Sequence, residues 1–214
     1  MHEALAHTGR PIVFSFCQYG LYAVWKWGAE SGANLWRTTG DIKDNWSQMS
    51  LIGFQQASLE KFAGPGHRND PDMLEVGNGG MKTAEYQTHM CLWAMLAAPL
   101  LASNDLSSMT HNTLSILLNK NVIAIDQDAL GQLGYRVWAE GPLEIWERQL
   151  AHGYKAIAFF NRGESAMSFP INTATLGVHS GAAFEDPWLA DTKILRDGSE
   201  ILVPPHCVIL LRSK

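Results

Sequence analysis

The chain has 214 residues, of which 46% are hydrophobic and 17% are charged, so it can bury a sizeable core and is not disordered. The formal net charge of −5 and the lack of any Lys/Arg run argue against nucleic acid and anionic membranes as partners. Pro99 interrupts the longest apolar stretch, residues 90–102, so no segment predicts a membrane span, which takes about 20 apolar residues.

Four short apolar segments predict buried strands, and each adjoins a cluster of polar or small residues. The segments are residues 12–16, 34–36, 73–76 and 100–102. The clusters are marked by Cys17, Asp41, Asp72 and Asn104. They recur every 24 to 32 residues, which is typical of a strand–helix repeat. Such a repeat predicts a parallel sheet, and polar residues at its strand ends are where this class of fold places its chemistry.

Helical patterns lie between these segments. Residues 45–62 repeat apolar side chains at helical spacing and meet a stop at Gly64. Residues 82–98 predict a second helix, which should be deeply buried because its later part is apolar nearly all round. A third, shorter helix is predicted to start over residues 113–118.

The pattern changes after residues 131–134, where short alternating segments separated by turn signals replace the helices. The segments are residues 135–139, 143–148, 154–160, 166–169, 184–188 and 208–211. This pattern predicts an antiparallel β-domain. We therefore expect an α/β domain over residues 1–132 and an all-β domain over residues 133–214.

The cysteines and histidines predict no metal centre or cofactor. Cys17, Cys91 and Cys207 each lie in an apolar run, and their odd number and wide spacing predict free, buried thiols and no disulfide framework. The eight histidines are scattered, with no pair at metal-ligand spacing.

Asp41 is the strongest candidate for a catalytic residue. It lies at the end of an apolar stretch, four residues after Arg37, where a carboxylate can protonate a leaving oxygen. A direct pair with Arg37 would favour the ionised form, so the acid role favours an Arg37 that binds a substrate hydroxyl. The alternative is that Asp41 caps the helix that follows.

Other polar residues at the predicted strand ends have structural alternatives as well. Asp70 and Asp72 flank Pro71 and could form an acid–base pair, or one of them could hold loop amides. Gln18 could bond sugar hydroxyls and Tyr19 could stack on a sugar, or both could form an ordinary strand-to-loop edge. The Asn104–Asp105 pair favours a loop and a helix cap.

Together the clusters resemble glycoside hydrolase family 27, the α-galactosidases and α-N-acetylgalactosaminidases. The matching segments are residues 10–20, 36–42, 64–74, 98–106 and 122–128. The resemblance implies the C-terminal half of a (β/α)8 barrel over residues 1–132, followed by an antiparallel β-sandwich over residues 133–214.

By this resemblance, Asp41 is the general acid/base and Arg37 binds the sugar. The pocket would also be lined by Cys17, Gln18, Tyr19 and Met73. The family's nucleophilic aspartate, in a Lys-x-Asp context, has no match here and is expected upstream of Met1. A half-barrel alone would leave an open sheet edge and an exposed apolar interior.

Two departures from the family pattern bear on specificity and on cross-linking. Many relatives have Glu followed by Trp where this chain has Gln18 and Tyr19, which leaves galactose, N-acetylgalactosamine and arabinopyranose open as the preferred sugar. Some relatives bond the cysteine matching Cys17 to one just before the Trp–Arg pair, but residues 31–35 contain no cysteine.

The first hypothesis is therefore that the chain is part of a retaining α-galactosidase that acts on α-galactosides. Homo-oligomerisation is left open. The resemblance is compatible with secretion or a periplasmic location. A second hypothesis is a fragment that binds carbohydrate or another chain without catalysis. A third is a metal-dependent barrel enzyme that uses Asp41, Asp70 and Asp72.

Overall fold

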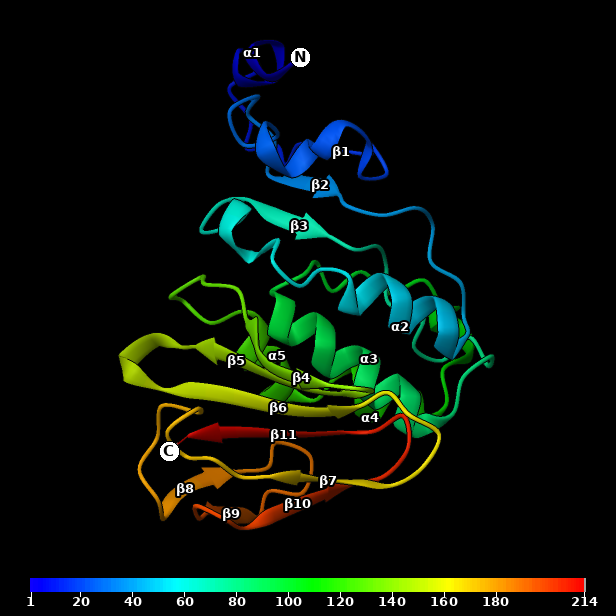
Figure 1. The fold of residues 1–214 in the computed structure, drawn as a ribbon. Helices are drawn as coiled ribbons and strands as arrows, with labels where there is room; N and C mark the ends of the chain where they lie inside the picture. The colour runs from blue at the N-terminus through cyan, green and yellow to red at the C-terminus, as the bar shows by residue number, and fades with distance from the viewer. Residues whose placement is uncertain (214) are drawn as a thin grey trace.

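A computed structural model describes residues 1–213 as a parallel α/β part above two antiparallel sheets (Figure 1). The parallel sheet has the order β1-β2-β3. Its strands are β1 (Ser15–Phe16), β2 (Leu35–Arg37) and β3 (Arg68–Asp70). The next two predicted strands along the chain are joined by a single parallel bridge between Leu74 and Ala102. The parallel arrangement confirms the strand–helix interpretation of the first part of the sequence.

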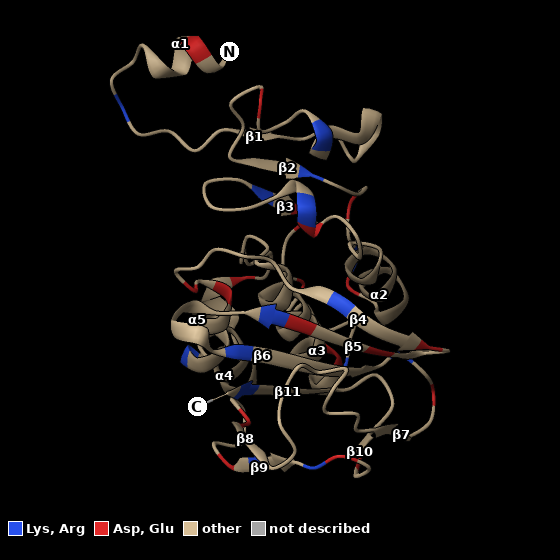
Figure 2. Ribbon diagram, turned by 60° about the vertical axis from the view of Figure 1, so that its left-hand side comes forward, with Lys and Arg blue, Asp and Glu red and all other residues tan. Residues whose placement is uncertain are grey.

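Helices connect and flank these strands. The α-helices are α1 (His2–Ala6), α2 (Trp46–Phe54), α3 (Thr83–Leu96), α4 (His111–Leu117) and α5 (Lys120–Asp126). The 3-10 helices are η1 (Leu21–Lys26), η2 (Glu60–Phe62), η3 (Leu106–Ser108) and η4 (Ala151–Gly153). Helix α1 buries no residue and stands apart from the sheets (Figures 1 and 2). Within residues 1–213, no helix has the length and apolar character needed to cross a membrane.

The predictions for α3 and α4 are confirmed, and α3 is buried along most of its length as expected. Helix α2 ends at Phe54, so the prediction that it continues to residue 62 is wrong. The predictions also missed α5, a helix of only seven residues that follows α4 almost directly.

The strand predictions were partly wrong. The predicted strand at residues 12–16 retains two strand residues, and Ile12 and Val13 are exposed because β1 pairs only with β2 in the described chain. Residues 73–76 and 100–102 contribute only the isolated bridge. Strand β3 was missed because its residues are polar. Its buried Asn69 is satisfied by hydrogen bonds with the Trp36 indole (2.7 Å) and the Leu59 carbonyl (2.9 Å).

The second part of the chain forms a six-stranded sheet, β4-β5-β6-β11-β8-β9, and a two-stranded sheet, β10-β7. Its strands are β4 (Tyr135–Glu140), β5 (Leu143–Gln149), β6 (Lys155–Asn161), β7 (Met167–Pro170), β8 (Ala182–Glu185), β9 (Thr192–Leu195), β10 (Glu200–Val203) and β11 (Val208–Ser213). The antiparallel prediction is confirmed. Strands β9 and β10 were missed, because each is short and half exposed, and β8 begins before the predicted segment 184–188.

The central strands β5 and β6 of the six-stranded sheet are buried on both faces, whereas β4 and β9 at its edges are largely exposed. Ile145 and Ile157 pack into the core between the two sheets, whereas Trp146 and Phe160 belong to the core shared with α2 and α3. Successive side chains of a strand point to opposite faces of its sheet. Strands β5 and β6 therefore pack on the second sheet with one face and on the α/β part with the other.

Polar contacts also join the two parts. The His206 ring contacts the Glu85 carboxylate of α3 through Nδ1 (2.7 Å) and Glu164 through Nε2 (3.0 Å), and it stacks on Trp46 of α2 with ring centroids 4.2 Å apart. Arg148 of β5 is fully buried and donates to the carbonyls of Ala94 and Asp126, at the ends of α3 and α5.

Asp126 makes the stability of this interface dependent on pH. Burial raises the pKa of Asp126 to about 7, although Arg148 and Arg68 oppose the shift. In an unfolded chain the pKa of Asp is about 3.9, so between about pH 4 and 7 the folded protein holds a proton that the unfolded chain releases. We therefore expect the free energy of unfolding to fall as the pH rises through this window, by up to about 1.4 kcal/mol per pH unit.

Asp126→Asn should remove this component of the pH dependence and should make the protein more stable at pH 8. Urea unfolding of both proteins from pH 4 to pH 8 tests this expectation. Parallel stability profiles for the two proteins over that range would contradict it.

The cysteines differ in their surroundings, and all three are free. Cys91 is buried, and burial raises its pKa to about 12, as expected of a structural thiol. Cys207 is partly buried. The prediction that Cys17 is buried is wrong, because β1 ends at Phe16 and Cys17 lies exposed in the loop that follows.

Candidate active site

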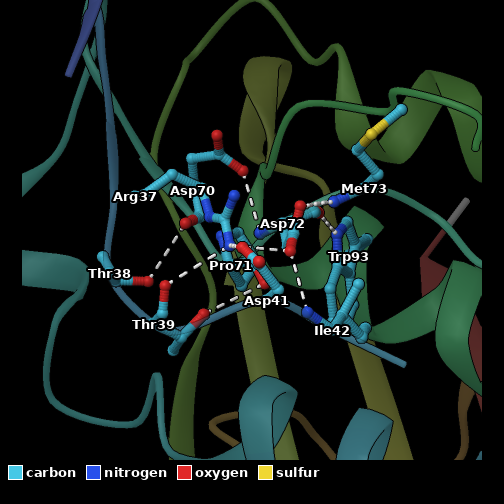
Figure 3. Close-up of polar contacts among 10 residues, drawn as sticks. All are labelled: Arg37, Thr38, Thr39, Asp41, Ile42, Asp70, Pro71, Asp72, Met73 and Trp93. Atoms are coloured by element: carbon cyan, nitrogen blue, oxygen red, sulfur yellow. Dashed lines mark hydrogen bonds and ion pairs between the residues drawn. The ribbon is translucent and has the colours of Figure 1, made fainter. Parts of the chain in front are cut away.

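The carboxyl ends of β2 and β3 bring the predicted acid and its neighbours together (Figure 3). The parallel register pairs Arg37 with Asp70, the last residues of the two strands. The amide of Thr38 donates to the Asp70 carbonyl at 2.9 Å and extends this pairing by one residue. The loop that carries Asp41 therefore leaves the sheet beside the segment that carries Asp72.

Arg37 lies between two carboxylates that differ in exposure. Its Nη2 contacts Asp72 Oδ2 at 2.7 Å and Asp41 Oδ1 at 3.1 Å. The Asp41 side chain is 74% exposed, whereas those of Arg37 and Asp72 are 12% and 10% exposed. The expectation that Arg37 avoids a direct pair with Asp41 is not met in this structure. Asp41 nevertheless remains open to an incoming molecule.

Asp72 organises the cluster in the structural role that the sequence left open for one of the two acids beside Pro71, that of holding loop amides. Its carboxylate accepts hydrogen bonds from the amides of Ile42 and Met73, both at 2.8 Å, and its carbonyl accepts from the Trp93 indole at 2.8 Å. Its backbone has a φ of 96°, a conformation that is strained for a residue with a side chain. Its position two residues beyond the end of a strand, after Pro71, was the available signal in the sequence.

The structural alternative for Asp70 is confirmed, and the capping alternative for Asp41 is wrong. Asp70 accepts the amide of Asp72 at 2.9 Å, and burial raises the pKa of its carboxyl. No helix starts at Asp41. Helix α2 begins later, and the side chain of Asn45 caps it by accepting from the amide of Gln48 at 3.0 Å.

Tyr19 and Cys17 lie at the rim of the same cluster. The Arg37 guanidinium carbon is 5.6 Å from the centre of the Tyr19 ring, a cation–π arrangement. A hydrogen bond with Cys17, its charge and then that of Asp41 raise the pKa of Tyr19, while Arg37 opposes the shift. These interactions place four of the predicted site residues, Cys17, Tyr19, Arg37 and Asp41, next to one another.

Gln18 and Met73 are less closely joined to the cluster. Gln18 is half-buried, and its carbonyl accepts the amide of Leu21 at 2.8 Å in the turn after β1. The Met73 side chain is 37% exposed and points away from Arg37 and Asp41 (Figure 3). Their places in a sugar pocket remain predictions.

The carboxylates are not arranged as a metal site. Asp72 is occupied by Arg37 and two amides, and Asp70 by the Asp72 amide. Within residues 1–213, no group of three or more His, Cys, Asp or Glu residues could hold a metal ion. Asp41 is the carboxylate of this cluster that stays open to solvent.

Asp72→Asn should destabilise the protein by at least about 2 kcal/mol, because it removes one partner of a buried ion pair. We also expect faster hydrogen exchange at the Ile42 amide, which the Asp72 carboxylate holds. Urea unfolding and amide exchange of Ile42 measure the two effects.

Asp41→Asn is the matched control, because it touches the same guanidinium from an exposed position. It should lower the free energy of unfolding by less than about 1 kcal/mol. Equal losses in the two variants would contradict the role of Asp72 as the organising residue.

Comparison with known proteins agrees with this architecture. Residues 1–128 match the sequence model of the family described as alpha galactosidase A. Residues 140–213 match that of the alpha galactosidase C-terminal beta sandwich domain. The chain belongs to the α-galactosidase family, glycoside hydrolase family 27. The predicted combination of barrel half and β-sandwich is thereby confirmed.

Individual relatives give the same result. The chain is 43% identical to alpha-galactosidase 2 of Arabidopsis thaliana over 96% of its own length and 52% of that protein. It is similar to the crystal structure of alpha-galactosidase I from Mortierella vinacea, with a TM-score of 0.93, 30% identity and coverage of 100% of this chain and 61% of that one. It is also similar to a GH27 β-L-arabinopyranosidase from Geobacillus stearothermophilus, with a TM-score of 0.90, 28% identity and coverage of 100% and 52%.

The chain spans about half the length of the curated relatives that it matches. Within the described residues, β1 pairs with β2 alone, and its outer edge is unpaired.

Proposed function

We propose that the chain is the C-terminal part of a retaining α-galactosidase in which Asp41 is the general acid/base. The observation that carries this proposal is the exposed Asp41 carboxylate in a cluster whose other acids are engaged. Polar residues at the carboxyl ends of parallel barrel strands are where this fold places its catalytic groups.

The proposed reaction needs a second carboxylate, which a segment outside these 214 residues would supply. That carboxylate attacks the anomeric carbon while Asp41 gives its proton to the leaving oxygen. Asp41 then takes a proton from water, and the water displaces the sugar from the covalent intermediate. Two inversions preserve the α configuration, with the carboxyl groups about 5–5.5 Å apart.

Arg37 has donor capacity left for a sugar hydroxyl. Its Nε atom is buried and has no hydrogen-bond partner among residues 1–213. We propose that Asp72 holds the guanidinium while an N–H group binds the substrate, as the resemblance implies. Cys17, Gln18, Tyr19 and Met73 would line the pocket around it. Galactose is the proposed sugar, with N-acetylgalactosamine and arabinopyranose as the alternatives.

The match leaves about half of the Arabidopsis relative uncovered, and the resemblance implies that this is its N-terminal half. The test joins this chain to that half. A hybrid that unfolds cooperatively should hydrolyse melibiose, whereas this chain alone should not. The three sugars are then compared as 4-nitrophenyl glycosides. A cooperatively folded hybrid that cleaves none of them would contradict the proposal and favour a non-catalytic fragment.

A further inference from the structure

A groove of about 270 Å³ opens at the edge of the β-sandwich, near the lower end of the size range of small-ligand pockets. It is lined by Trp138, Ile145, Pro170, Asn172, Thr175 and Leu176. Ile145 and Leu176 are 5% and 1% exposed and form an apolar floor. None of these six lining residues is charged, so the chemistry of the groove suits an uncharged ligand.

A β-bulge directs Trp138 into this position. Arg136 pairs with Trp146 and Trp138 pairs with Ile145, so Val137 is an extra residue in the edge strand β4. The indole ring packs edge-on against Phe169 of β7, with centroids 5.9 Å apart, and bridges the opening between the two sheets. A bulge of this kind re-aims a side chain at a sheet edge.

A fixed turn forms the opposite wall. The side chain of Asn172 accepts the Thr175 amide at 2.9 Å, and its carbonyl accepts the Leu176 amide at 3.2 Å. The Thr173 amide donates to Asp197 at 3.0 Å, which ties the turn to the neighbouring loop. These contacts form the wall before any ligand binds, which reduces the ordering entropy lost on binding.

Three polar groups at the groove have no hydrogen-bond partner among residues 1–213. They are the Trp138 indole N–H, the Asn172 amide nitrogen and the Thr175 hydroxyl. Each is available to a ligand, and together they offer two donors and one group that can both donate and accept.

We propose that this groove is a saccharide-binding site separate from the Asp41 cluster. A pyranose ring presents a face of C–H groups that can lie on the Trp138 indole, and its rim of hydroxyl groups matches the three free polar groups. The floor of the groove, Ile145 and Leu176, is part of the core between the two sheets, whereas the opposite face of the six-stranded sheet packs on α3. The site can therefore hold a second sugar unit while the cluster at the barrel strand ends is occupied.

The indole resonances of the chain, followed by NMR during titration with galactose, melibiose and cellobiose, test this proposal. We expect the Trp138 resonance to shift with at least one of these sugars. Trp138→Ala should weaken that binding at least about tenfold, and Thr175→Val, which keeps the side-chain shape but removes the hydroxyl, at least about threefold. Arg37→Met is the control at the barrel cluster and should leave the Trp138 titration unchanged.

A Trp138 resonance that none of the three sugars shifts would overturn the proposal. So would binding that Arg37→Met abolishes and Thr175→Val leaves intact, which would place the sugar at the barrel cluster instead. If Trp138→Ala does not fold, Thr175→Val together with Trp138→Phe decides the question, and unchanged affinity in both variants would overturn the proposal.

Discussion

In the hybrid that joins this chain to the N-terminal half of the Arabidopsis relative, here called the completed barrel, Asp41→Asn is expected to lower the rate of melibiose hydrolysis about 10²- to 10⁴-fold. This is the usual contribution of general acid–base catalysis. The amide cannot protonate the glucose leaving group, so the first step fails. A galactoside with a dinitrophenolate leaving group needs no such proton, so its first step should survive. Its second step should slow, because Asp41 also activates water, and the covalent intermediate should accumulate.

Steady-state kinetics on both substrates and a pre-steady-state burst of phenolate measure these effects. Asp105→Asn is the matched control, because Asp105 lies in the polar cluster after residues 100–102. Among residues 1–213, its carboxylate accepts hydrogen bonds only from Ser107 and Ser108. It should leave both rates within about twofold of the parent. Equal loss on the two substrates in Asp41→Asn, without a burst, would exclude the acid/base role.

Arg148→Met is expected to lower the free energy of unfolding by about 2–6 kcal/mol, because two carbonyl acceptors in the interior each lose a donor. Arg148 is fully buried and donates to carbonyls at the C-terminal ends of two helices, α3 and α5. A cation there adds a charged donor to carbonyl groups at the two helix ends and opposes the negative end of each helix dipole. Its loss also leaves the Asp126 carboxylate without a counter-charge that lowers its pKa.

Urea unfolding of Arg148→Met measures this loss. Arg136→Met is the control in the same sheet, because Arg136 is 39% exposed and lies 3.4 Å from Glu144. It should change stability by less than about 1 kcal/mol. The double variant Asp126→Asn with Arg148→Met should recover part of the loss at pH 8. A single Arg148→Met variant as stable as the control would show that the helix ends do not need this cation.

The sequence was most informative where one signal determined the local structure. The nearly all-round apolar character of α3 and the alternating segments at β5 and β6 predicted those elements, because deep burial of a helix or of a sheet face selects apolar side chains. Strand β3 escaped detection because its buried side chains are polar and are satisfied by partners far along the chain, such as Trp36.

In the candidate site as well, some residues could be predicted from the sequence and others could not. Asp41 and Arg37 were predictable from their spacing and from the family resemblance. The role of Asp72 depends on a backbone conformation with positive φ and on bonds to Arg37, 35 residues away, and to Ile42, 30 residues away. Sequence spacing does not show that Asp72 and Arg37 share one strand edge, because that contact follows from the parallel register of β2 and β3.

The most direct test of the acid/base assignment uses the completed barrel with Asp41→Ala, the dinitrophenyl galactoside and added azide. Azide needs no general base, so it should attack the covalent intermediate and restore turnover. Two inversions then give α-galactosyl azide, which NMR identifies by its anomeric coupling. Formation of β-galactosyl azide would mean that the nucleophile had been removed, and no rescue by azide would mean that Asp41 is not the acid/base.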